Sequence, residues 1–514
     1  MSYLEPITIE KISLENFQSF QEKVEIPIKP LTFLFGPNSA GKSSIYDSML
    51  LVNLILKNKQ SEFINLYYKW LHTPRKTSKE HNIGKMVIEV QFSAWELLIG
   101  GRNGYHGDTI NIPDEYKNST ELKELLSDCY GPYDLQISIP PSFPYEYDLT
   151  ISACGLKIFC LYTPENGDGR EIEFSSEIFG AAFTQIAARH NFEPPKNSLC
   201  KVKCYAYNLE NGLKVDNYLI NESYDRDLIL IANHIIQCFV KSTFLPQSVS
   251  SDRSTIKNTE LSELFISNGQ FINAPIQVKE ATTTHHSDSI RKISESKLEE
   301  FLSIKECKKD EYNLIDSLHY FVNQSLSHHL FLDQGYQIAF DIYELNPANE
   351  IYKYDNFYGA LLITYLTDNS GRRMTFEDVG TGISCVLPVI VALDGWRSFI
   401  QQPELHLHPA LQSALGDIFV EAINKNDSCR HIIETHSDYL LLRCLRRIRE
   451  TSNGRISERS KLKLKPTDVS VLYFDPQLDG TTKVKTIRVS TQGDFIDRWP
   501  RGFFEERGKD IFDE

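Results

Sequence analysis

The chain has 514 residues, of which 41% are hydrophobic and 24% charged, a balance that indicates a globular protein with a sizeable core rather than a disordered one. Its formal net charge of −15 argues against a protein that coats nucleic acid with its whole surface. No apolar run reaches the ~18 residues of a membrane span, and no basic, apolar leader is visible, so a cytoplasmic protein without membrane contact is expected.

The N-terminal segment, residues 1–81, has the pattern of an α/β unit. Its first 35 residues alternate apolar and polar side chains, which predicts two or three strands. The last of these strands runs directly into the glycine-rich stretch "GPNSAGKS", and a helical pattern follows from Ser43 to about residue 58. This glycine-rich stretch is therefore predicted to be the turn between a strand and a helix.

The middle of the chain is predicted to be an insertion in two parts. Residues 82–224 contain strand-like runs separated by turns, which predicts a β-rich lobe with an antiparallel sheet. Residues 225–332 have mainly helical periodicity, interrupted at 279–289 by a polar stretch. That stretch, with His285 and His286, is expected to be an exposed tip that mediates oligomerisation or partner docking.

The remainder of the chain returns to α/β character. Strands and helices alternate through residues 333–465 and continue into a C-terminal α/β tail at 466–514. Both chain ends are therefore expected to form one α/β domain around the insertion.

The glycine-rich turn fits the pattern G-x-x-x-x-G-K-[ST], which predicts a binding site for ATP with Mg²⁺. Its backbone amides would surround the β-phosphate, Lys42 would lie between the β- and γ-phosphates, and the Ser43 hydroxyl would bind Mg²⁺. The predicted nucleotide-binding residues of this loop are Gly36, Pro37, Asn38, Ser39, Ala40, Gly41, Lys42, Ser43 and Ser44.

Three further segments follow in the C-terminal part. A second glycine-rich turn precedes an apolar helix and is a candidate anion site; its predicted binding residues are Gly380, Thr381, Gly382 and Ser384. An apolar strand then leads into "QQPELHLHP", which contains Gln401, Gln402 and Glu404. Finally, "RHIIETHSDYLLLR" places His436 after a strand, where a histidine can reach a terminal phosphate or an attacking water.

This order of segments resembles the ABC-type ATPase heads of the branch that includes SMC, RecF and the overcoming-lysogenisation-defect family. The likeness is carried by "NFQSF", "GPNSAGKSS", "DVGTGISCVLP", "PELHLHP" and "IIETHSDYLLLR". It implies an α/β P-loop ATPase head, formed by both chain ends, that dimerises around two ATP molecules. In these terms residues 36–44 are the Walker A motif, 378–384 the signature, Gln401 and Gln402 the Walker B pair, and His436 the switch histidine.

The two glutamines stand where ordinary ABC heads have acids, the first of which holds Mg²⁺ through water while the second acts as the general base. A glutamine has no charge and accepts no proton at neutral pH, so the chain is expected to be an ATPase that is slow or inactive. Defence-type relatives are expected to have E-Q-P-E here, so only Gln401 departs from them. Natural degeneration and an engineered replacement of glutamate both explain Gln401. Glu404 is expected to orient the neighbouring loop.

The terminal stretch "WPRGFFEERGKDIF" resembles the tail of ATPases from bacterial antiphage defence loci, such as Septu-like and retron-associated systems. No toprim-like acidic cluster follows the head. The resemblance therefore implies a sensor or regulatory subunit that controls a separate effector, a nuclease or a toxin.

Several alternatives remain open. A RecF- or SMC-like ATPase for DNA repair or chromosome maintenance would bind DNA through the basic segment from Leu441 to Lys465. The energy subunit of a transporter fits least well, because such subunits lack an insertion of this size. The run "ELHLH" also admits a metal site at Glu404, His406 and His408. Ten cysteines without a CxxC pair indicate reduced core thiols, with a zinc site or a disulfide framework as the alternative.

Overall fold

A computed structural model of the chain separates into two compact units. One unit consists of Met1–Pro246, Val469–Arg488 and Asp497–Glu514, and the other of Gln247–Asp468 and Val489–Ile496. The structure describes residues 8–57, 62–63, 65–67, 85–92, 133–139, 147–153, 156–162, 170–177, 199–206, 245–251, 290–292, 320–331, 335–345, 360–374, 381–457 and 459–500.

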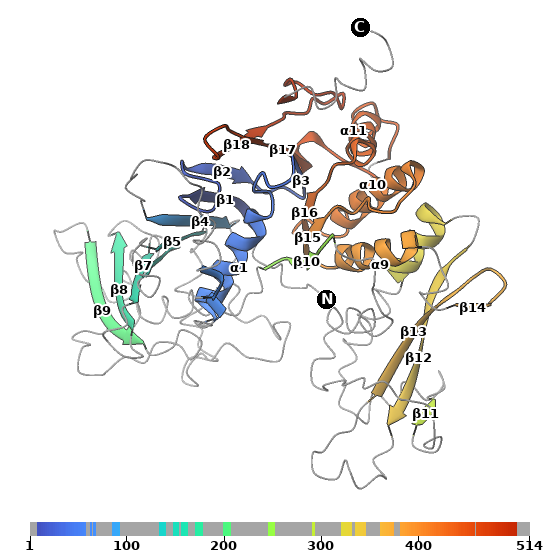
Figure 1. The fold of residues 1–514 in the computed structure, drawn as a ribbon, viewed down its shortest axis with the longest axis horizontal. Helices are drawn as coiled ribbons and strands as arrows, with labels where there is room; N and C mark the ends of the chain where they lie inside the picture. The colour runs from blue at the N-terminus through green and yellow to red at the C-terminus, as the bar shows by residue number, and fades with distance from the viewer. Residues whose placement is uncertain are drawn as a thin grey trace. The chain divides into compact units, whose positions relative to one another are not determined.

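The first unit contains an eight-stranded antiparallel sheet, in the order β2-β1-β4-β5-β6-β7-β8-β9. Alternate residues of β4 are buried, as expected for strands that cover a core with one face. The sheet combines β4 to β9, which lie in the range predicted as an antiparallel lobe, with β1 and β2, which precede the glycine-rich loop (Figure 1). Its strands are β1 (Ile9–Glu15), β2 (Val24–Pro27), β4 (Met86–Phe92), β5 (Tyr133–Ile139), β6 (Tyr147–Ala153), β7 (Leu156–Tyr162), β8 (Arg170–Glu177) and β9 (Leu199–Ala206).

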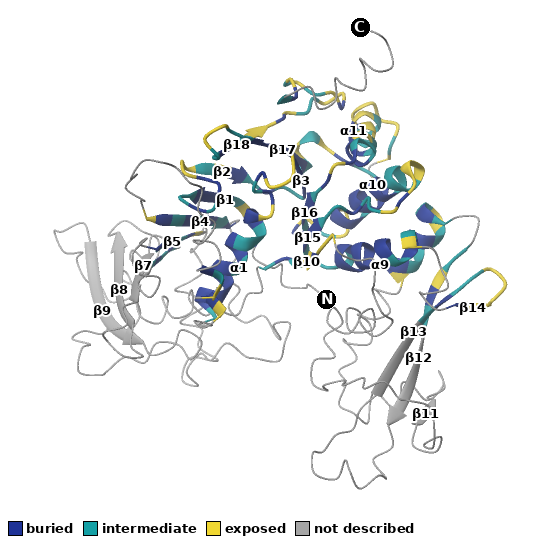
Figure 2. Ribbon diagram, viewed as in Figure 1, coloured by how far each residue is buried: buried dark blue, intermediate teal, exposed yellow. Residues whose placement is uncertain are grey.

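The same unit joins the two ends of the chain. Strand β3 (Leu31–Phe35) pairs in parallel with β17 (Val469–Pro476), which pairs antiparallel with β18 (Thr482–Thr486). All five residues of β3 are buried, as is usual for a parallel strand covered on both faces (Figure 2). Helix α1 (Ser44–Leu56) follows β3 after the glycine-rich loop. The predicted strand, turn and helix are thus confirmed.

The second unit has a parallel set of three strands, β10 (Gln247–Val249), β15 (Arg397–Gln401) and β16 (Arg430–Glu434). Helix α9 (Thr381–Asp394) packs against β10 and β15, and helix α10 (Pro409–Ile423) packs against α9 and against α11 (Asp438–Ser452). Figure 1 shows the three helices. The central residues of β15 and β16 are buried, and the last residue of each strand is half-buried. The functional segments of this unit follow the ends of these two strands.

Strand β10 lies in the range 225–332, which was predicted to be helical. It has only three residues, too few to show a strand period, and it is placed by its parallel pairing with β15. Of the long helical stretches expected in this range, the part at residues 320–326 is described and is helical. The remainder of these stretches and the tip at His285 and His286 lie outside the described residues.

A second sheet in this unit is antiparallel. It contains β11 (Ile290–Lys292), β12 (Gln337–Leu345), β13 (Ala360–Thr367) and β14 (Arg373–Met374). A helical segment, described from Tyr320 onward, ends in a π-helical turn, η2 (Leu326–Leu330), which packs against α10. None of the helices that the structure describes has the length and apolar character needed to cross a bilayer. The model confirms the predicted α/β class with P-loop architecture.

Candidate nucleotide-binding site

The loop between β3 and α1 has the backbone geometry of a phosphate-binding loop. Gly36 and Gly41 have φ angles of +138° and +85°, values that side-chain-bearing residues rarely adopt. A Cβ at Gly36 would lie 2.5 Å from the carbonyl oxygen of Phe474 on β17, and a Cβ at Gly41 would overlap the Oγ of Ser19. Both positions therefore require glycine, and both bring the loop close to its neighbours.

Lys42 is folded into this loop. Its side chain is buried, and its ammonium donates to the carbonyl oxygens of Gly36 and Pro37, both at 2.9 Å. Ser43 is exposed, and its side chain makes no capping hydrogen bond at the start of α1. A cation between loop carbonyls, together with an exposed hydroxyl at a helix N-terminus, matches what a nucleotide phosphate and its Mg²⁺ require. The residues therefore fit ATP with Mg²⁺.

The turn at "NFQSF" contacts the glycine-rich loop and the start of α1. Asn16 and Gln18 have positive φ angles of 51° and 49°, and Phe17 and Phe20 form an isolated bridge between them. Gln18 Nε2 donates to Asp47 on α1 at 2.8 Å, and its Oε1 accepts from the hydroxyl of Ser44. This contribution of Gln18 was not predicted, because the two segments lie apart in the sequence.

The first Walker B position lies at the end of β15 and faces an acid on the neighbouring strand. Gln401 and Glu434 are register partners at the ends of β15 and β16, and Gln401 Nε2 donates to Glu434 Oε2 at 3.2 Å. Gln402 follows in the left-handed region with φ +46°, and its backbone N–H donates to the carbonyl oxygen of Glu434 at 2.7 Å. Glu434 was not predicted as a site residue, although it ends an apolar strand in the same way as Gln401.

Glu404 holds the loop that carries the predicted switch histidine. Its Oε1 accepts from the backbone N–H of His436 at 2.8 Å, and its Oε2 accepts from the hydroxyl of Thr435, also at 2.8 Å. The His436 side chain is exposed. Ser437 caps α11 and donates to Gln412 of α10 at 2.6 Å. Two loops that follow adjacent strands are therefore fixed to each other.

The predicted signature segment is partly described. Gly380 lies outside the described residues. Thr381 and Gly382, predicted to form a turn before the helix, instead lie in the first turn of α9, and Ser384 follows in the same helix. A Cβ at Gly382 would lie 3.1 Å from the carbonyl oxygen of His406. The helix start thus packs closely against the loop after β15.

The alternative metal site at "ELHLH" receives no support. Both carboxylate oxygens of Glu404 already accept hydrogen bonds, and His408 caps α10 by accepting from the N–H of Ala410 at 3.3 Å. Among the described residues, no group of three or more His, Cys, Asp or Glu could hold a metal ion. Cys385, Cys429 and Cys444 are free and buried, as expected for core thiols. Burial raises the pKa of Cys429 to about 11, so this thiol is unreactive at neutral pH.

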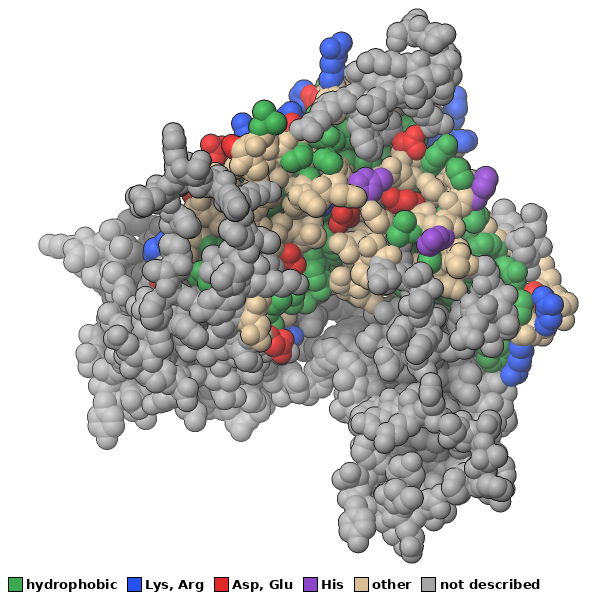
Figure 3. All heavy atoms as spheres, in the orientation of Figure 1, with side chains coloured by type: hydrophobic (Ala, Val, Ile, Leu, Met, Phe, Trp, Pro, Cys, Tyr) green, Lys and Arg blue, Asp and Glu red, His purple; other side chains and the backbone are tan. Residues whose placement is uncertain are grey.

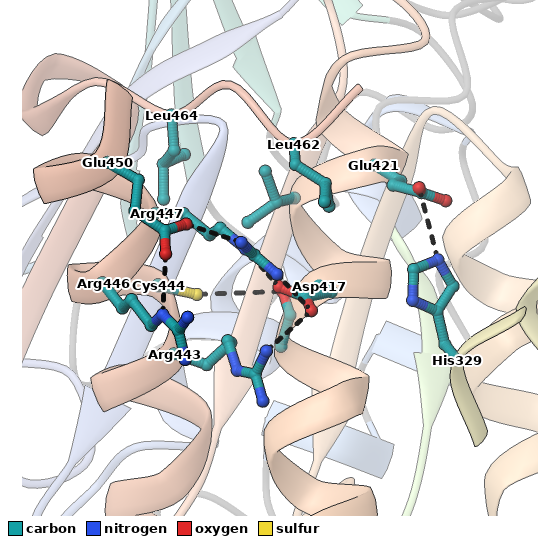
Figure 4. A network of polar contacts seen from close by, with 12 residues as sticks. His329, Asp417, Glu421, Arg443, Cys444, Arg446, Arg447, Glu450, Leu462 and Leu464 are labelled. Carbon is teal, nitrogen blue, oxygen red and sulfur yellow. Dashed lines mark hydrogen bonds and ion pairs between the residues drawn. The ribbon is translucent and has the colours of Figure 1, made fainter. Parts of the chain in front are cut away.

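Much of the predicted basic segment is paired within the protein (Figure 4). Asp417 of α10 is buried and forms ion pairs with two arginines of α11, Arg447 at 2.7 Å and Arg443 at 3.1 Å. Glu450 forms ion pairs with Arg446 at 2.8 Å and with Arg447 at 2.6 Å. The hydrogen bonds that Arg447 donates to Asp417 raise the pKa of Arg447 further above its usual range. These arginines therefore hold α10 and α11 together.

The described basic side chains on the face shown in Figure 3 do not form a basic patch either. Arg449 donates to Asp494 at 2.9 Å and to the carbonyl oxygen of Gln492 at 2.8 Å. On the described part of the face shown in Figure 3, Lys and Arg side chains lie scattered toward its margins and do not form one continuous patch. Four of the nine basic residues counted between Leu441 and Lys465 thus pair with acids of the same chain.

Comparisons with known proteins agree with this geometry. A family model described as "AAA ATPase domain" matches residues 8–441, which is more than half of the chain. A second model, described as "Protein of unknown function (DUF3696)", matches residues 464–513, the part that contains the predicted tail. A search of curated proteins finds no match.

Several solved structures of SMC heads are similar to the chain. An SMC head bound to the C-winged helix domain of ScpA is 11% identical, with 94% of this chain and 98% of that chain covered and a TM-score of 0.39. The SMC head domain from Thermotoga maritima is 8% identical, with coverages of 94% and 100% and a TM-score of 0.37. An SMC head from Pyrococcus furiosus, bound to the C-terminal domain of ScpA, is 10% identical, with coverages of 94% and 96% and a TM-score of 0.39. At such low similarity these structures assign no residue role to this chain.

Proposed function

Because the chain belongs to the AAA ATPase domain family, we propose that it binds Mg-ATP at the loop of residues 36–44 and that bound ATP joins two copies of the chain. The observation that carries the proposal is the loop itself, with two positions that only glycine fits and with the buried ammonium of Lys42 held by loop carbonyls. Phosphate oxygens would replace these carbonyls as the partners of Lys42. Ser43 would then hold Mg²⁺.

Replacement of Lys42 tests the binding site. Lys42→Ala is expected to weaken binding of a fluorescent ATP analogue by at least ~10-fold, because hydrogen bonds to charged groups contribute roughly 1.5–3 kcal/mol. Lys23→Ala is the matched control, since Lys23 is not part of the loop and pairs with Glu89 of β4. Equal affinities of the chain as written and of Lys42→Ala would refute the site.

The second element of the proposal is slow hydrolysis. Neither Gln401 nor Gln402 can accept a proton from water at neutral pH, and Glu404 is occupied by the loop of His436. We expect Gln401→Glu to raise turnover by at least ~10²-fold, the size typical of a restored acid–base or metal function. Equal steady-state rates would contradict this expectation.

The third element is ATP-dependent dimerisation through the signature segment and the exposed His436. Light scattering coupled to size-exclusion chromatography is expected to show a larger species with ATP and Mg²⁺ than without nucleotide. Gly382→Trp should block this shift, because the bulky side chain would lie at the start of α9, in the predicted signature segment. An equal molar mass with and without ATP would refute ATP-dependent dimerisation.

The biological role that we propose is a sensor or regulatory subunit of a bacterial antiphage defence complex, acting on a separate nuclease or toxin. The likeness of the C-terminal tail supports this role. The competing role, a DNA-binding ATPase for repair, needs the basic segment, in which Arg443, Arg446, Arg447 and Arg449 have internal partners. Stable co-purification with the product of a neighbouring gene would favour defence, whereas salt-sensitive DNA binding by the isolated chain would favour repair.

A further inference from the structure

A tryptophan of the C-terminal tail packs where the nucleotide-binding loop begins. Trp499 is 6% exposed, and its ring meets that of Phe35 edge-on, with the ring centroids 5.2 Å apart and the planes at 87°. Tyr473 of β17 also meets Trp499 edge-on, at 6.2 Å and 90°. Phe35 is the last residue of β3, and Gly36 of the loop follows it directly. All four residues belong to the first unit of the chain.

We propose that Trp499 is a positioning residue for the nucleotide-binding loop: it holds the end of β3 against β17 and thereby keeps the loop in the geometry that binds phosphate. The proposal rests on the proposed binding of ATP at residues 36–44 and gives the C-terminal tail a role in it. Trp499 acts on the loop through Phe35, so its role is distinct from that of the residues proposed to contact the phosphates.

Trp499 contacts both members of one register pair. Phe35 and Tyr473 are the last partners in the parallel ladder between β3 and β17. The side chains of such partners lie on the same face of a sheet, so one indole can pack on both of them. Aromatic rings in edge-to-face geometry attract each other beyond the effect of the area that they bury. The tail therefore fixes the spacing of the two strands at the point where the loop starts.

The start of the loop depends on a close approach to β17. A Cβ at Gly36 would lie 2.5 Å from the carbonyl oxygen of Phe474, so the loop backbone passes very near that strand. The carbonyl oxygen of Gly36 in turn accepts a hydrogen bond from the ammonium of Lys42 at 2.9 Å. A shift of β3 relative to β17 would therefore move the residue that orients the phosphate-binding lysine.

The other face of β17 carries a second aromatic contact near the loop. Phe474 follows Tyr473 in the strand, so its side chain points to the opposite face. It packs against Phe20, with the ring centroids 6.2 Å apart and the planes at 65°. The ring of Phe20 also lies 3.5 Å from the position of a Cβ at Gly41. Aromatic packing thus supports the loop from both faces of β17, and Trp499 provides it on one of them.

An ion pair holds the segment that carries Trp499. The guanidinium of Arg488 donates to both carboxylate oxygens of Asp497, at 2.7 and 2.9 Å, and the backbone N–H of Arg488 donates to the same carboxylate at 2.8 Å. These hydrogen bonds lower the pKa of Asp497 to about 2, so the pair is ionised at neutral pH. Because Asp497 lies two residues before Trp499, the pair limits the movement of the indole.

The experiment measures the affinity of folded variants of the full chain for a fluorescent ATP analogue. Trp499→Leu keeps an apolar side chain but removes the ring, and it is expected to weaken binding by about 3- to 10-fold, the size of one edge-to-face contact. Tyr473→Leu removes the other ring of the contact and should weaken binding to the same extent. Trp499→Phe keeps a ring and should bind within ~2-fold of the chain as written. Circular dichroism verifies that each variant is folded at the temperature of the titration.

Phe92→Leu is the matched control. Phe92 is buried and ends β4, where its register partners are Ile9 and Tyr133. The change removes a buried ring from the same unit, at a strand that does not lead into the loop. It should lower the midpoint of urea unfolding, as Trp499→Leu does, and leave the affinity for the ATP analogue within ~2-fold. The control therefore separates a loss of stability from a loss of loop geometry.

The outcomes distinguish the positioning role from the proposed function. If the chain as written binds the analogue and either Trp499→Leu or Tyr473→Leu binds it equally well, the positioning role is refuted while the ATP site stands. The role is also refuted if Phe92→Leu weakens binding as much as Trp499→Leu, or if Trp499→Phe binds as weakly as Trp499→Leu. If the chain as written does not bind the analogue, the proposed ATP site itself is refuted.

Discussion

Gln401→Glu should destabilise the ligand-free protein at neutral pH, although the same change is expected to speed hydrolysis. The reason is the neighbouring acid, because Gln401 Nε2 lies 3.2 Å from Glu434 Oε2. Two unit charges at that separation repel by about 5 kcal/mol at an effective dielectric constant of about 20, and by roughly 1.3 kcal/mol in bulk water. Since both residues are half-buried, we expect a loss of about 1–5 kcal/mol in the free energy of unfolding.

The assay is urea unfolding without nucleotide, in EDTA, for the single variant and for the double variant Gln401→Glu/Glu434→Gln. The double variant is the control, because it contains the same new glutamate without an acid opposite. It should be more stable than the single variant at pH 7. At pH 5 the difference should shrink, because one of two adjacent carboxylates takes up a proton more readily than an isolated one. Added Mg²⁺ should stabilise the single variant selectively.

The result that would refute this reasoning is equal unfolding of the single and double variants at pH 7. Such equality would mean that side chains 401 and 434 do not face each other. If Gln401→Glu instead raises the turnover and lowers the free energy of unfolding, it shows the usual trade-off between activity and stability at functional sites that contain like charges.

Three further predictions concern residues around the site. Asp417→Ala leaves two arginines without their buried partner and should lower the free energy of unfolding by about 3–5 kcal/mol in urea titrations; a change below about 1 kcal/mol would contradict the network in Figure 4. Burial lowers the pKa of His431 to about 3, so the imidazole stays neutral in the folded state. The free energy of unfolding should therefore fall as the pH drops below ~6.5, by about 2 kcal/mol at pH 5. His431→Gln should remove this part of the pH dependence. Gly41→Ala should weaken ATP binding by at least ~10-fold, because φ is +85° and the new Cβ would overlap Ser19, and unchanged affinity in equilibrium dialysis would contradict the loop geometry.

The local parts of the site were predictable from sequence because each is coded within a few residues. The glycine-rich turn between β3 and α1 needs two glycines, a lysine and a serine at fixed spacing, and all four are found between Gly36 and Ser43. The short apolar strands before Gln401 and before His436 were equally visible. The contact between residues 401 and 434 was not, because it depends on the register of two parallel strands. A three-residue strand such as β10 was also beyond prediction, since its conformation depends on β15.

The basic segment shows a second limit of sequence patterns. Glu450 lies three and four residues after Arg447 and Arg446, a spacing that already indicates pairing on a helix. Asp417 lies on another helix, and nothing in its local sequence indicates that it binds Arg443 and Arg447. A count of charges therefore overestimated the basic surface, because α10 supplies the acid that α11 needs.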